Sequence, residues 1–129
     1  MKILVWANKK ELGFDEIPEK QGVYLIACDC KNGKSYVVYT GQTDNLRRRT
    51  KEHWSDNEPN KELKDAIAKY KSAFKVVYAE VDNINDLDGI EKYLFNYYQP
   101  QLTDRAPDFE PIEVVLPNSV EKGKVNFVG

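Results

Sequence analysis

Two β-branched runs on either side of an Asn-Gly pair constrain the fold of this chain more than any other feature. Residues 22–30 (GVYLIACDC) and 35–41 (SYVVYTG) form these runs, and Asn32 and Gly33 lie between them. Asn-Gly flanked by such runs is a strong signal for a β-hairpin, because both residues tolerate the positive φ angles of a tight turn. The sequence therefore predicts two antiparallel strands joined at residues 31–34.

The turn also predicts which side chains of the two strands face each other. With Asn-Gly as the two turn residues, the paired positions are Tyr24 with Gly41, Ile26 with Tyr39, and Cys28 with Val37. Paired residues share a face of the sheet, and so do alternate residues of one strand. Tyr24 and Tyr39 are therefore expected on one face as diagonal neighbours. Tyrosines in a hairpin most often serve packing alone, so only their surroundings can indicate another role.

Hydrophobic periodicity predicts the remaining elements. Helices are expected over residues 44–55 (capped by Thr43 or Asp44), about 58–70 and 85–98, and further strands over 2–7, 74–81, 112–117 and 124–128. This order predicts an α+β fold with a small, mainly antiparallel sheet, covered by three helices and extended by N- and C-terminal strands. The length suits a single domain over 1–129, with a core at about 17–103 and a C-terminal extension over 104–129.

Glu91 breaks the apolar pattern of the helix predicted over 85–98. It lies on the stripe formed by Leu87, Ile90, Leu94 and Tyr98. A carboxylate that faces a core is costly unless it is paired, protonated or bound to a metal. The alternative interpretation is a glutamate at the margin of the stripe, which reaches solvent or pairs with a lysine.

The charge of the chain is unevenly distributed along its length. The net charge is −2, yet residues 31–75 hold eleven basic and six acidic side chains, and residues 76–129 hold four basic and ten acidic ones. On the helix predicted over 44–55, Arg49 and His53 are four residues apart and share a face, whereas a run of arginines is more often a solvated surface. A phosphate-contacting surface is therefore expected in the middle of the chain.

Several classes of protein are excluded by what the sequence lacks. Cys28, Cys30 and the single histidine, His53, cannot supply four zinc ligands, so we expect reduced cysteines. Glycine-rich phosphate loops of the two common patterns are absent, and no serine motif accompanies His53. The N-terminal apolar run breaks into charge within a few residues, which is too short for a signal sequence or a membrane span. A cytoplasmic protein is therefore expected.

Taken together, these residues resemble the GIY-YIG endonuclease domain family. The matching positions are Gly22-Val23-Tyr24, Tyr39-Thr40-Gly41, Arg49, His53 and Glu91. The resemblance covers about residues 17–103. Within the family, the chain is similar to the N-terminal nuclease domain of the bacterial excision-repair incision subunit and to stand-alone members. Three features depart from the family pattern. They are Thr40 in place of a small aliphatic residue, a separation of fifteen residues between the two tyrosines, and Thr103 where an asparagine is common.

The resemblance implies hydrolysis of a DNA phosphodiester bond with one divalent cation, Mg²⁺ or Mn²⁺. Glu91 would bind the ion, because magnesium prefers oxygen ligands and is commonly held by one or two carboxylates. Arg49 would contact phosphate oxygens through its planar guanidinium group. Tyr39 is the candidate base that activates water and Tyr24 would orient it, although the reverse assignment stays open. His53 would be a hydrogen-bond partner of a tyrosine or of phosphate, or an alternative base.

Further residues are assigned supporting roles by the same resemblance. Expected DNA contacts are Arg47, Arg48 and Lys51, and expected structural residues are Gly22, Gly41, Gln42 and Thr103. RNA as a substrate, a homodimer and a recruiting protein partner all stay open. The competing hypothesis is a nucleic-acid-binding or partner-recruited module of the same fold that cuts weakly or not at all. It is motivated by the acidic total, by Thr103 and by the lack of an obvious second DNA-binding domain.

Overall fold

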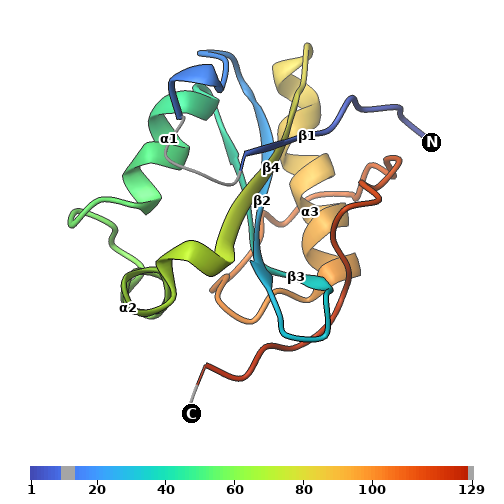
Figure 1. The fold of residues 1–129 in the computed structure, drawn as a ribbon. Helices are drawn as coiled ribbons and strands as arrows, with labels where there is room; N and C mark the ends of the chain where they lie inside the picture. Colours follow the sequence, from blue (N-terminus) through green and yellow to red (C-terminus); the bar gives the residue numbers. More distant parts are fainter. Residues whose placement is uncertain (10–13, 128–129) are drawn as a thin grey trace.

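The computed structural model describes residues 1–9 and 14–127, which form a twisted sheet with helices on both of its faces (Figure 1). The strands are β1 (Ala7–Lys9), β2 (Gly22–Asp29), β3 (Ser35–Thr43) and β4 (Phe74–Glu80), and the α-helices are α1 (Leu46–His53), α2 (Lys61–Lys69) and α3 (Leu87–Tyr98). Three single-turn 3₁₀ helices lie at Phe14–Glu16, Lys71–Ala73 and Ile84–Asp86. The strand order is β1-β4-β2-β3 and each pairing is antiparallel, so the predicted α+β class is confirmed.

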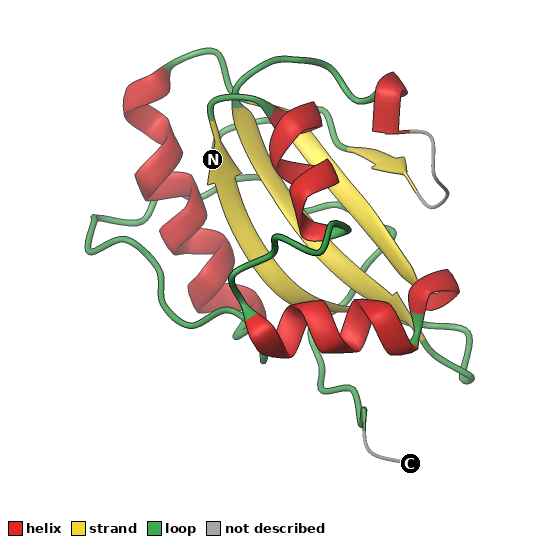
Figure 2. Cartoon of the chain, turned by 90° about the vertical axis from the view of Figure 1, so that its left-hand side faces the viewer, coloured by secondary structure: helices red, strands yellow, loops and turns green. Residues whose placement is uncertain are grey.

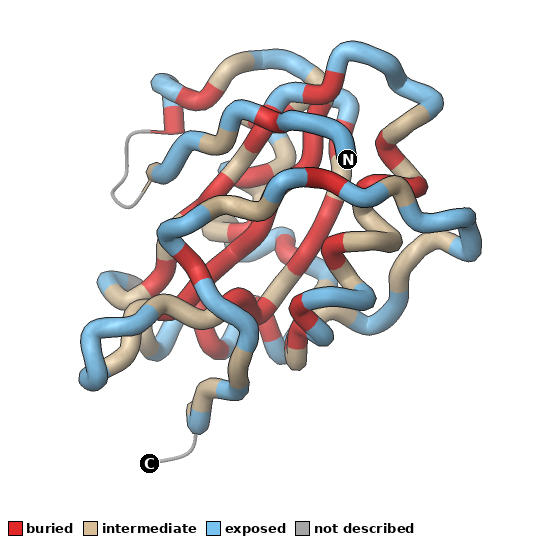
Figure 3. The backbone as a smooth tube through the Cα atoms, turned by 90° about the vertical axis from the view of Figure 1, so that its right-hand side faces the viewer, coloured by how far each residue is buried: buried red, intermediate tan, exposed pale blue. Residues whose placement is uncertain are grey.

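The helices divide the core between the two faces of the sheet. One core joins α1 and α2 to Tyr24, Ile26 and Cys28 of β2, and the other joins α3 to the alternate residues Val23, Leu25 and Ala27. Figure 2 views the sheet from the side of α1 and α2, with α3 beyond the β3 edge. The central strands are accordingly buried along most of their length (Figure 3). A strand that is buried on both faces explains why residues 22–28 form a nearly continuous apolar run.

The predicted hairpin forms, but its register changes part-way along. As predicted, Tyr24 pairs with Gly41 and Ile26 with Tyr39. Cys28 pairs with Tyr36, so the prediction that it faces Val37 is wrong. The cause is a β-bulge at Val38, an extra residue on β3 that lies between the partners of Ile26 and Ala27. Because of the bulge, the consecutive residues Val38 and Tyr39 both pack on the side of α1 and α2, and Val37 packs on the α3 side.

Helix starts depend on asparagine side chains. Asn45 caps α1, because its side chain accepts a hydrogen bond from the Arg48 N–H at 3.0 Å. The predicted caps, Thr43 and Asp44, are therefore wrong; Thr43 instead accepts a hydrogen bond from the Asn45 N–H at 3.0 Å. Asn60 caps α2 in the same manner, accepting from the Leu63 N–H at 3.1 Å.

The two terminal regions depart most from the predicted strands. The N-terminal strand forms over Ala7–Lys9 instead of 2–7. Residues 112–117 contribute only an isolated bridge between Val114 and Lys2, and Glu121 makes another with Tyr36. Residues 124–127 form no strand, and Val128 lies outside the described residues. Prolines at 111 and 117 flank the expected strand and remove backbone donors from it, which limits its pairing. None of the helices in the described residues is long and apolar enough to cross a membrane.

The segment after α3 covers the exposed edge of β3. The Leu102 N–H donates to the Val38 carbonyl at 2.8 Å, and the Thr103 Oγ1 accepts from the Thr40 N–H at 2.9 Å. Thr103 therefore satisfies a backbone donor of an edge strand, beside the bulge and the YTG residues.

Replacing Thr103 with valine is expected to lower the free energy of unfolding by about 1–3 kcal/mol. Valine keeps the shape of threonine but leaves the Thr40 N–H without its acceptor. Urea unfolding at pH 7 measures the effect, and Thr103→Ser, which keeps the hydroxyl, is the control. Equal stability of the valine and serine variants would show that this hydrogen bond contributes nothing.

Candidate active site

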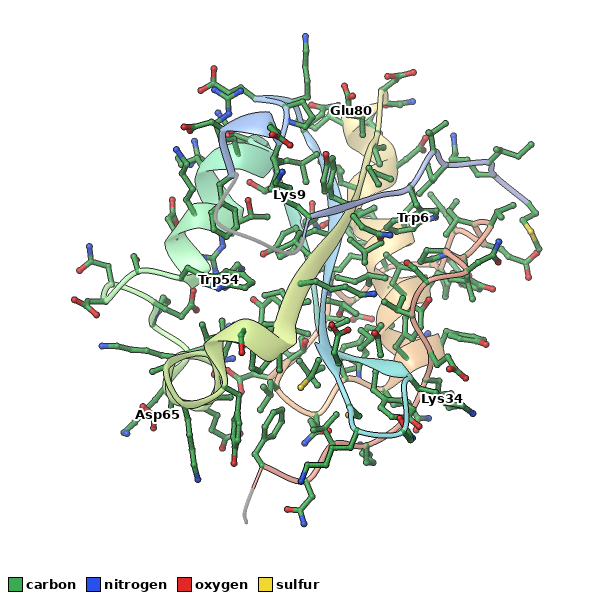
Figure 4. All side chains as sticks on the ribbon, in the orientation of Figure 1. Trp6, Lys9, Lys34, Trp54, Asp65 and Glu80 are labelled. Atoms are coloured by element: carbon green, nitrogen blue, oxygen red, sulfur yellow. The ribbon has the colours of Figure 1, made fainter. Side chains whose placement is uncertain are left out.

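Two tyrosines and a histidine meet on the face of the sheet that α1 covers. The hydroxyl of Tyr24 lies 2.7 Å from Nε2 of His53, and the ring of Tyr39 meets the imidazole edge-on at 4.9 Å between centroids. The two phenol rings stack with centroids 6.2 Å apart, so the predicted juxtaposition of Tyr24 and Tyr39 is confirmed. In Figure 4, Trp54 directly follows α1 and marks this side of the sheet, whereas Lys34 marks the hairpin turn. Strands β2 and β3 and helix α1 thus each supply one ring.

Two glycines make room for this packing. A Cβ atom on Gly41 would lie 2.5 Å from the Cζ and Oη atoms of Tyr24, so any larger residue would displace that phenol. A Cβ on Gly22 would lie 2.2 Å from the Ala79 carbonyl oxygen and 2.8 Å from the Cδ1 of Leu46. Each glycine therefore allows a close approach that a side chain would prevent.

Arg49 brings a half-buried positive charge to the tyrosine cluster. Its Nη1 lies 3.2 Å from a carboxylate oxygen of Glu52 and 3.5 Å from Oε2 of Glu58. Burial raises the pKa of Tyr24 well above its usual value, and it also raises the pKa of Tyr39; the Arg49 charge opposes both shifts. Both phenols are therefore neutral at pH 7.

Glu58 is a member of the cluster that the sequence did not reveal. Its side chain is fully buried, and its Oε2 lies 2.7 Å from Nδ1 of His53. Its other oxygen accepts a hydrogen bond from the Asn60 N–H at 3.1 Å. Residues 58–60 indicated only the start of a helix, because the contact with His53 depends on the course of the loop between α1 and α2.

The protonation states of His53 and Glu58 follow from these contacts. Burial lowers the pKa of His53 below its usual value, although the Glu58 carboxylate opposes this shift. Burial raises the pKa of Glu58, but the contacts with His53, with the Asn60 N–H and with Arg49 outweigh it and leave that pKa below its ordinary value. At pH 7 the pair therefore consists of a neutral imidazole and a carboxylate.

Glu91 lies on α3 near the β3 edge, where Gln42 follows Gly41. Burial, and next the charge of Asp88, raise the pKa of Glu91 to about 7, and hydrogen bonds from Gln42 oppose the shift. The Gln42 amide also donates to Asp88. Among the described residues, no lysine or arginine forms a salt bridge with Glu91 or Asp88. The negative charge of Glu91 also raises the pKa of Tyr24, so the carboxylate and the phenol share one electrostatic environment.

This acidic pair fits a divalent cation by its chemistry. Two carboxylates held together without a basic partner destabilise each other, and a bound cation would relieve that repulsion. Magnesium takes oxygen ligands and needs only one or two carboxylates from the protein. The described residues contain no group of three or more histidine, cysteine or acidic side chains arranged to hold a metal, so substrate and water would complete the coordination.

The other basic residues of α1 point away from the tyrosine cluster. Arg47 donates through Nε to the Ile17 carbonyl at 2.8 Å. Arg48 lies 3.4 Å from a carboxylate oxygen of Glu52, and Lys51 pairs with Asp15. Of the three consecutive arginines, only Arg49 therefore faces the rings.

Comparison with known proteins places these residues in a family. The family model of the GIY-YIG catalytic domain matches residues 20–104, which is most of the chain. The chain belongs to the GIY-YIG family. This confirms the resemblance found in the sequence, and with it the expected enzyme class, a GIY-YIG-type endonuclease. No curated protein matches the chain.

Solved structures agree with the fold of this GIY-YIG domain. A point mutant of the GIY-YIG N-terminal endonuclease domain of UvrC from Thermotoga maritima, bound to its catalytic divalent cation, is similar with a TM-score of 0.54 and 20% identity. The alignment covers 74% of this chain and 99% of that domain. The same UvrC domain with magnesium as its catalytic cation gives a TM-score of 0.52 and 20% identity, over 71% of this chain and 97% of that one.

Proposed function

We propose that this GIY-YIG domain is a metal-dependent endonuclease that hydrolyses phosphodiester bonds in DNA. The observation that supports it most strongly is the convergence of Tyr24, Tyr39, Arg49 and His53 in one packed cluster, with Glu91 in the same electrostatic environment. These groups come from two strands and two helices. Independent structural roles for each of them would not require that they meet.

One magnesium or manganese ion would be held by Glu91. The related UvrC domain carries magnesium as its catalytic cation, and the mutual repulsion of the Glu91 and Asp88 carboxylates supports a similar ion in this chain. When bound, the ion would polarise the phosphate and stabilise the leaving oxygen.

Tyr39 would activate the attacking water and Tyr24 would orient it. Tyr39 is only half-buried, so its hydroxyl can reach a water molecule, whereas Tyr24 is 1% exposed and engages His53. Because burial raises its pKa, Tyr39 is almost entirely protonated in the free protein and rarely available as a base, and the charge of Arg49 favours its ionised form. Arg49 would also contact the phosphate with its guanidinium fork and stabilise the charge of the transition state.

Incubation of the protein with supercoiled plasmid and magnesium tests the proposed function. Nicking is expected with the wild-type chain and is expected to stop when EDTA removes the metal. Nicking that persists undiminished in Glu91→Ala and Arg49→Ala variants would contradict the assigned site. Binding of DNA without cleavage of duplex, branched or damaged substrates would favour the competing hypothesis of a binding module.

The outer surface of α1 is the proposed path of the DNA backbone, formed by Arg47, Arg48 and Lys51. Two acidic partners of these residues are exposed: the side chain of Asp44, which pairs with Arg48, is 71% exposed, and that of Asp15 is 83% exposed. Exposed salt bridges contribute little stability, so phosphate groups can replace these carboxylates.

Replacing both Arg48 and Lys51 with alanine is expected to weaken DNA binding about equally for all sequences. The slope of log affinity against log salt concentration should fall by about 2, since each lost phosphate contact removes about one unit. Fluorescence anisotropy with a labelled duplex at several salt concentrations measures this slope. Alanine at Lys61 and Lys69, two exposed lysines of α2, is the matched control. A slope unchanged by the α1 pair would place the DNA elsewhere.

A further inference from the structure

Glu58 is an ionised carboxylate in a fully buried position, which is costly unless every oxygen finds a partner. Its Oε1 accepts the Asn60 N–H at 3.1 Å, and its Oε2 faces His53 at 2.7 Å and Arg49 at 3.5 Å. Asn60 itself is fixed, because it caps α2 and donates from Nδ2 to the Leu102 carbonyl at 2.7 Å. The carboxylate is therefore held from several directions.

The position of this carboxylate determines where His53 carries its proton. A neutral imidazole has one N–H and one acceptor nitrogen. Although the ring is not aligned for a straight hydrogen bond from Nδ1, the oxygen of Glu58 at 2.7 Å is the group that faces this nitrogen. A lone pair on Nδ1 would be repelled by the carboxylate, so the proton belongs on Nδ1. Nε2 is then the acceptor, and the Tyr24 hydroxyl at 2.7 Å donates to it.

We propose that Glu58 is a positioning residue of the nuclease site, which fixes the Nδ1–H form of His53 and thereby orients the hydroxyl of Tyr24. The carboxylate, imidazole and phenol lie in contact in the same order of groups as the aspartate, histidine and serine of hydrolase triads. With its proton directed to His53, the Tyr24 oxygen can accept a hydrogen bond from the neighbouring Tyr39 hydroxyl or from the attacking water. This last step rests on the proposed function, whereas the form of His53 does not.

Nitrogen NMR of the full chain tests the proposal directly, because His53 is the only histidine. Long-range ¹H–¹⁵N spectra at pH 7.5 distinguish a protonated ring nitrogen from an unprotonated one. The wild-type protein is expected to have a protonated Nδ1 and an unprotonated Nε2. The opposite arrangement in the wild-type protein would overturn the proposal without any variant.

The decisive variant is Glu58→Leu, which fills a similar volume and offers no acceptor to Nδ1. An N–H on that nitrogen would then be buried without a partner, so the proton is expected to move to Nε2. Glu52→Leu is the matched control, because Glu52 also contacts Arg49, at 3.2 Å, but does not face His53. The control is expected to keep the wild-type spectrum. An unchanged His53 spectrum in Glu58→Leu would overturn the proposal.

Plasmid nicking by the same variants links the form of His53 to catalysis. Glu58→Leu is expected to cut about 100-fold more slowly than wild type, and Glu52→Leu within about threefold of it. In a His53→Ala background, Glu58→Leu should have no further effect, because its role is exerted through the imidazole. Equal cutting by Glu58→Leu and wild type would overturn the catalytic part.

If no form cuts DNA, the spectra still decide the role of Glu58 and only the proposed function fails. Should Glu58→Leu not fold, the wild-type spectrum decides the role of Glu58, because an unprotonated Nδ1 of His53 would still overturn the proposal.

Discussion

Glu91→Gln is expected to reduce magnesium-dependent cleavage by at least about 1,000-fold, because it removes the proposed protein ligand of the ion. The amide has nearly the shape of the carboxylate, so the packing of α3 against β3 should survive. Plasmid nicking at saturating magnesium measures the loss. Calorimetric titration with magnesium separates lost metal binding from lost chemistry, and no binding is expected in the variant.

The same substitution is expected to stabilise the metal-free protein, in a manner that depends on pH. The pKa of Glu91 is raised to about 7 in the folded protein from an ordinary value of 4.5. The folded state therefore binds this proton more tightly than the unfolded state does. The free energy of unfolding falls as pH rises from about 4.5 to about 7, and stays lowered above that range. Replacing the carboxylate with an amide should therefore raise the free energy of unfolding by about 3 kcal/mol at pH 8 and by almost nothing at pH 4.

Urea unfolding with EDTA at pH 4 and pH 8 measures this difference. Glu80→Gln is the control, because Glu80 is an exposed carboxylate on β4 that lies outside the site. Magnesium at pH 8 should recover the stability of wild type but leave Glu91→Gln unchanged. A variant whose stability relative to wild type is the same at both pH values would contradict the buried, repelled carboxylate described above.

Local sequence patterns predicted the elements that depend on neighbouring residues. The Asn-Gly turn and its flanking runs predicted the hairpin, and hence the pairing that brings Tyr24 beside Tyr39. Glu91 was recognisable as a candidate site residue because helical periodicity predicts which face of the helix each residue occupies. A carboxylate on the apolar face departs from that pattern. The family resemblance then related groups that lie far apart in the chain.

Features that depend on the assembled fold could not be predicted in this manner. The bulge at Val38 places the consecutive residues Val38 and Tyr39 against the same core, which departs from the strict alternation that the turn pattern assumes. Glu58 becomes part of the site only because the loop after α1 returns its side chain to His53. No spacing rule relates a loop residue to a helix residue five positions before it. The prediction of the terminal strands was wrong for a similar reason, since their pairing depends on segments distant in the sequence.

Arg49→Ala is expected to reduce the rate of DNA cleavage by about 1,000-fold, a loss similar in size to that expected for Glu91→Gln. The guanidinium group is the half-buried cation of the tyrosine cluster, and loss of a cation that stabilises a phosphoryl-transfer transition state typically costs this much. Arg49→Lys keeps the charge but loses the planar fork, so an intermediate loss of about 100-fold is expected. Magnesium binding should be retained in both variants, which distinguishes them from Glu91→Gln.

A second effect of Arg49→Ala concerns His53. The Arg49 charge contributes to the lowered pKa of His53, while Glu58 opposes it. Without the arginine, Glu58 remains beside the imidazole, so the pKa of His53 should rise. Proton NMR titration of the single histidine measures this shift, and Arg48→Ala is the control, since Arg48 lies on the exposed side of the same helix. If His53 titrated alike in all three proteins, Arg49 would not share its electrostatic environment. Wild-type cleavage by Arg49→Ala would remove the arginine from the proposed mechanism.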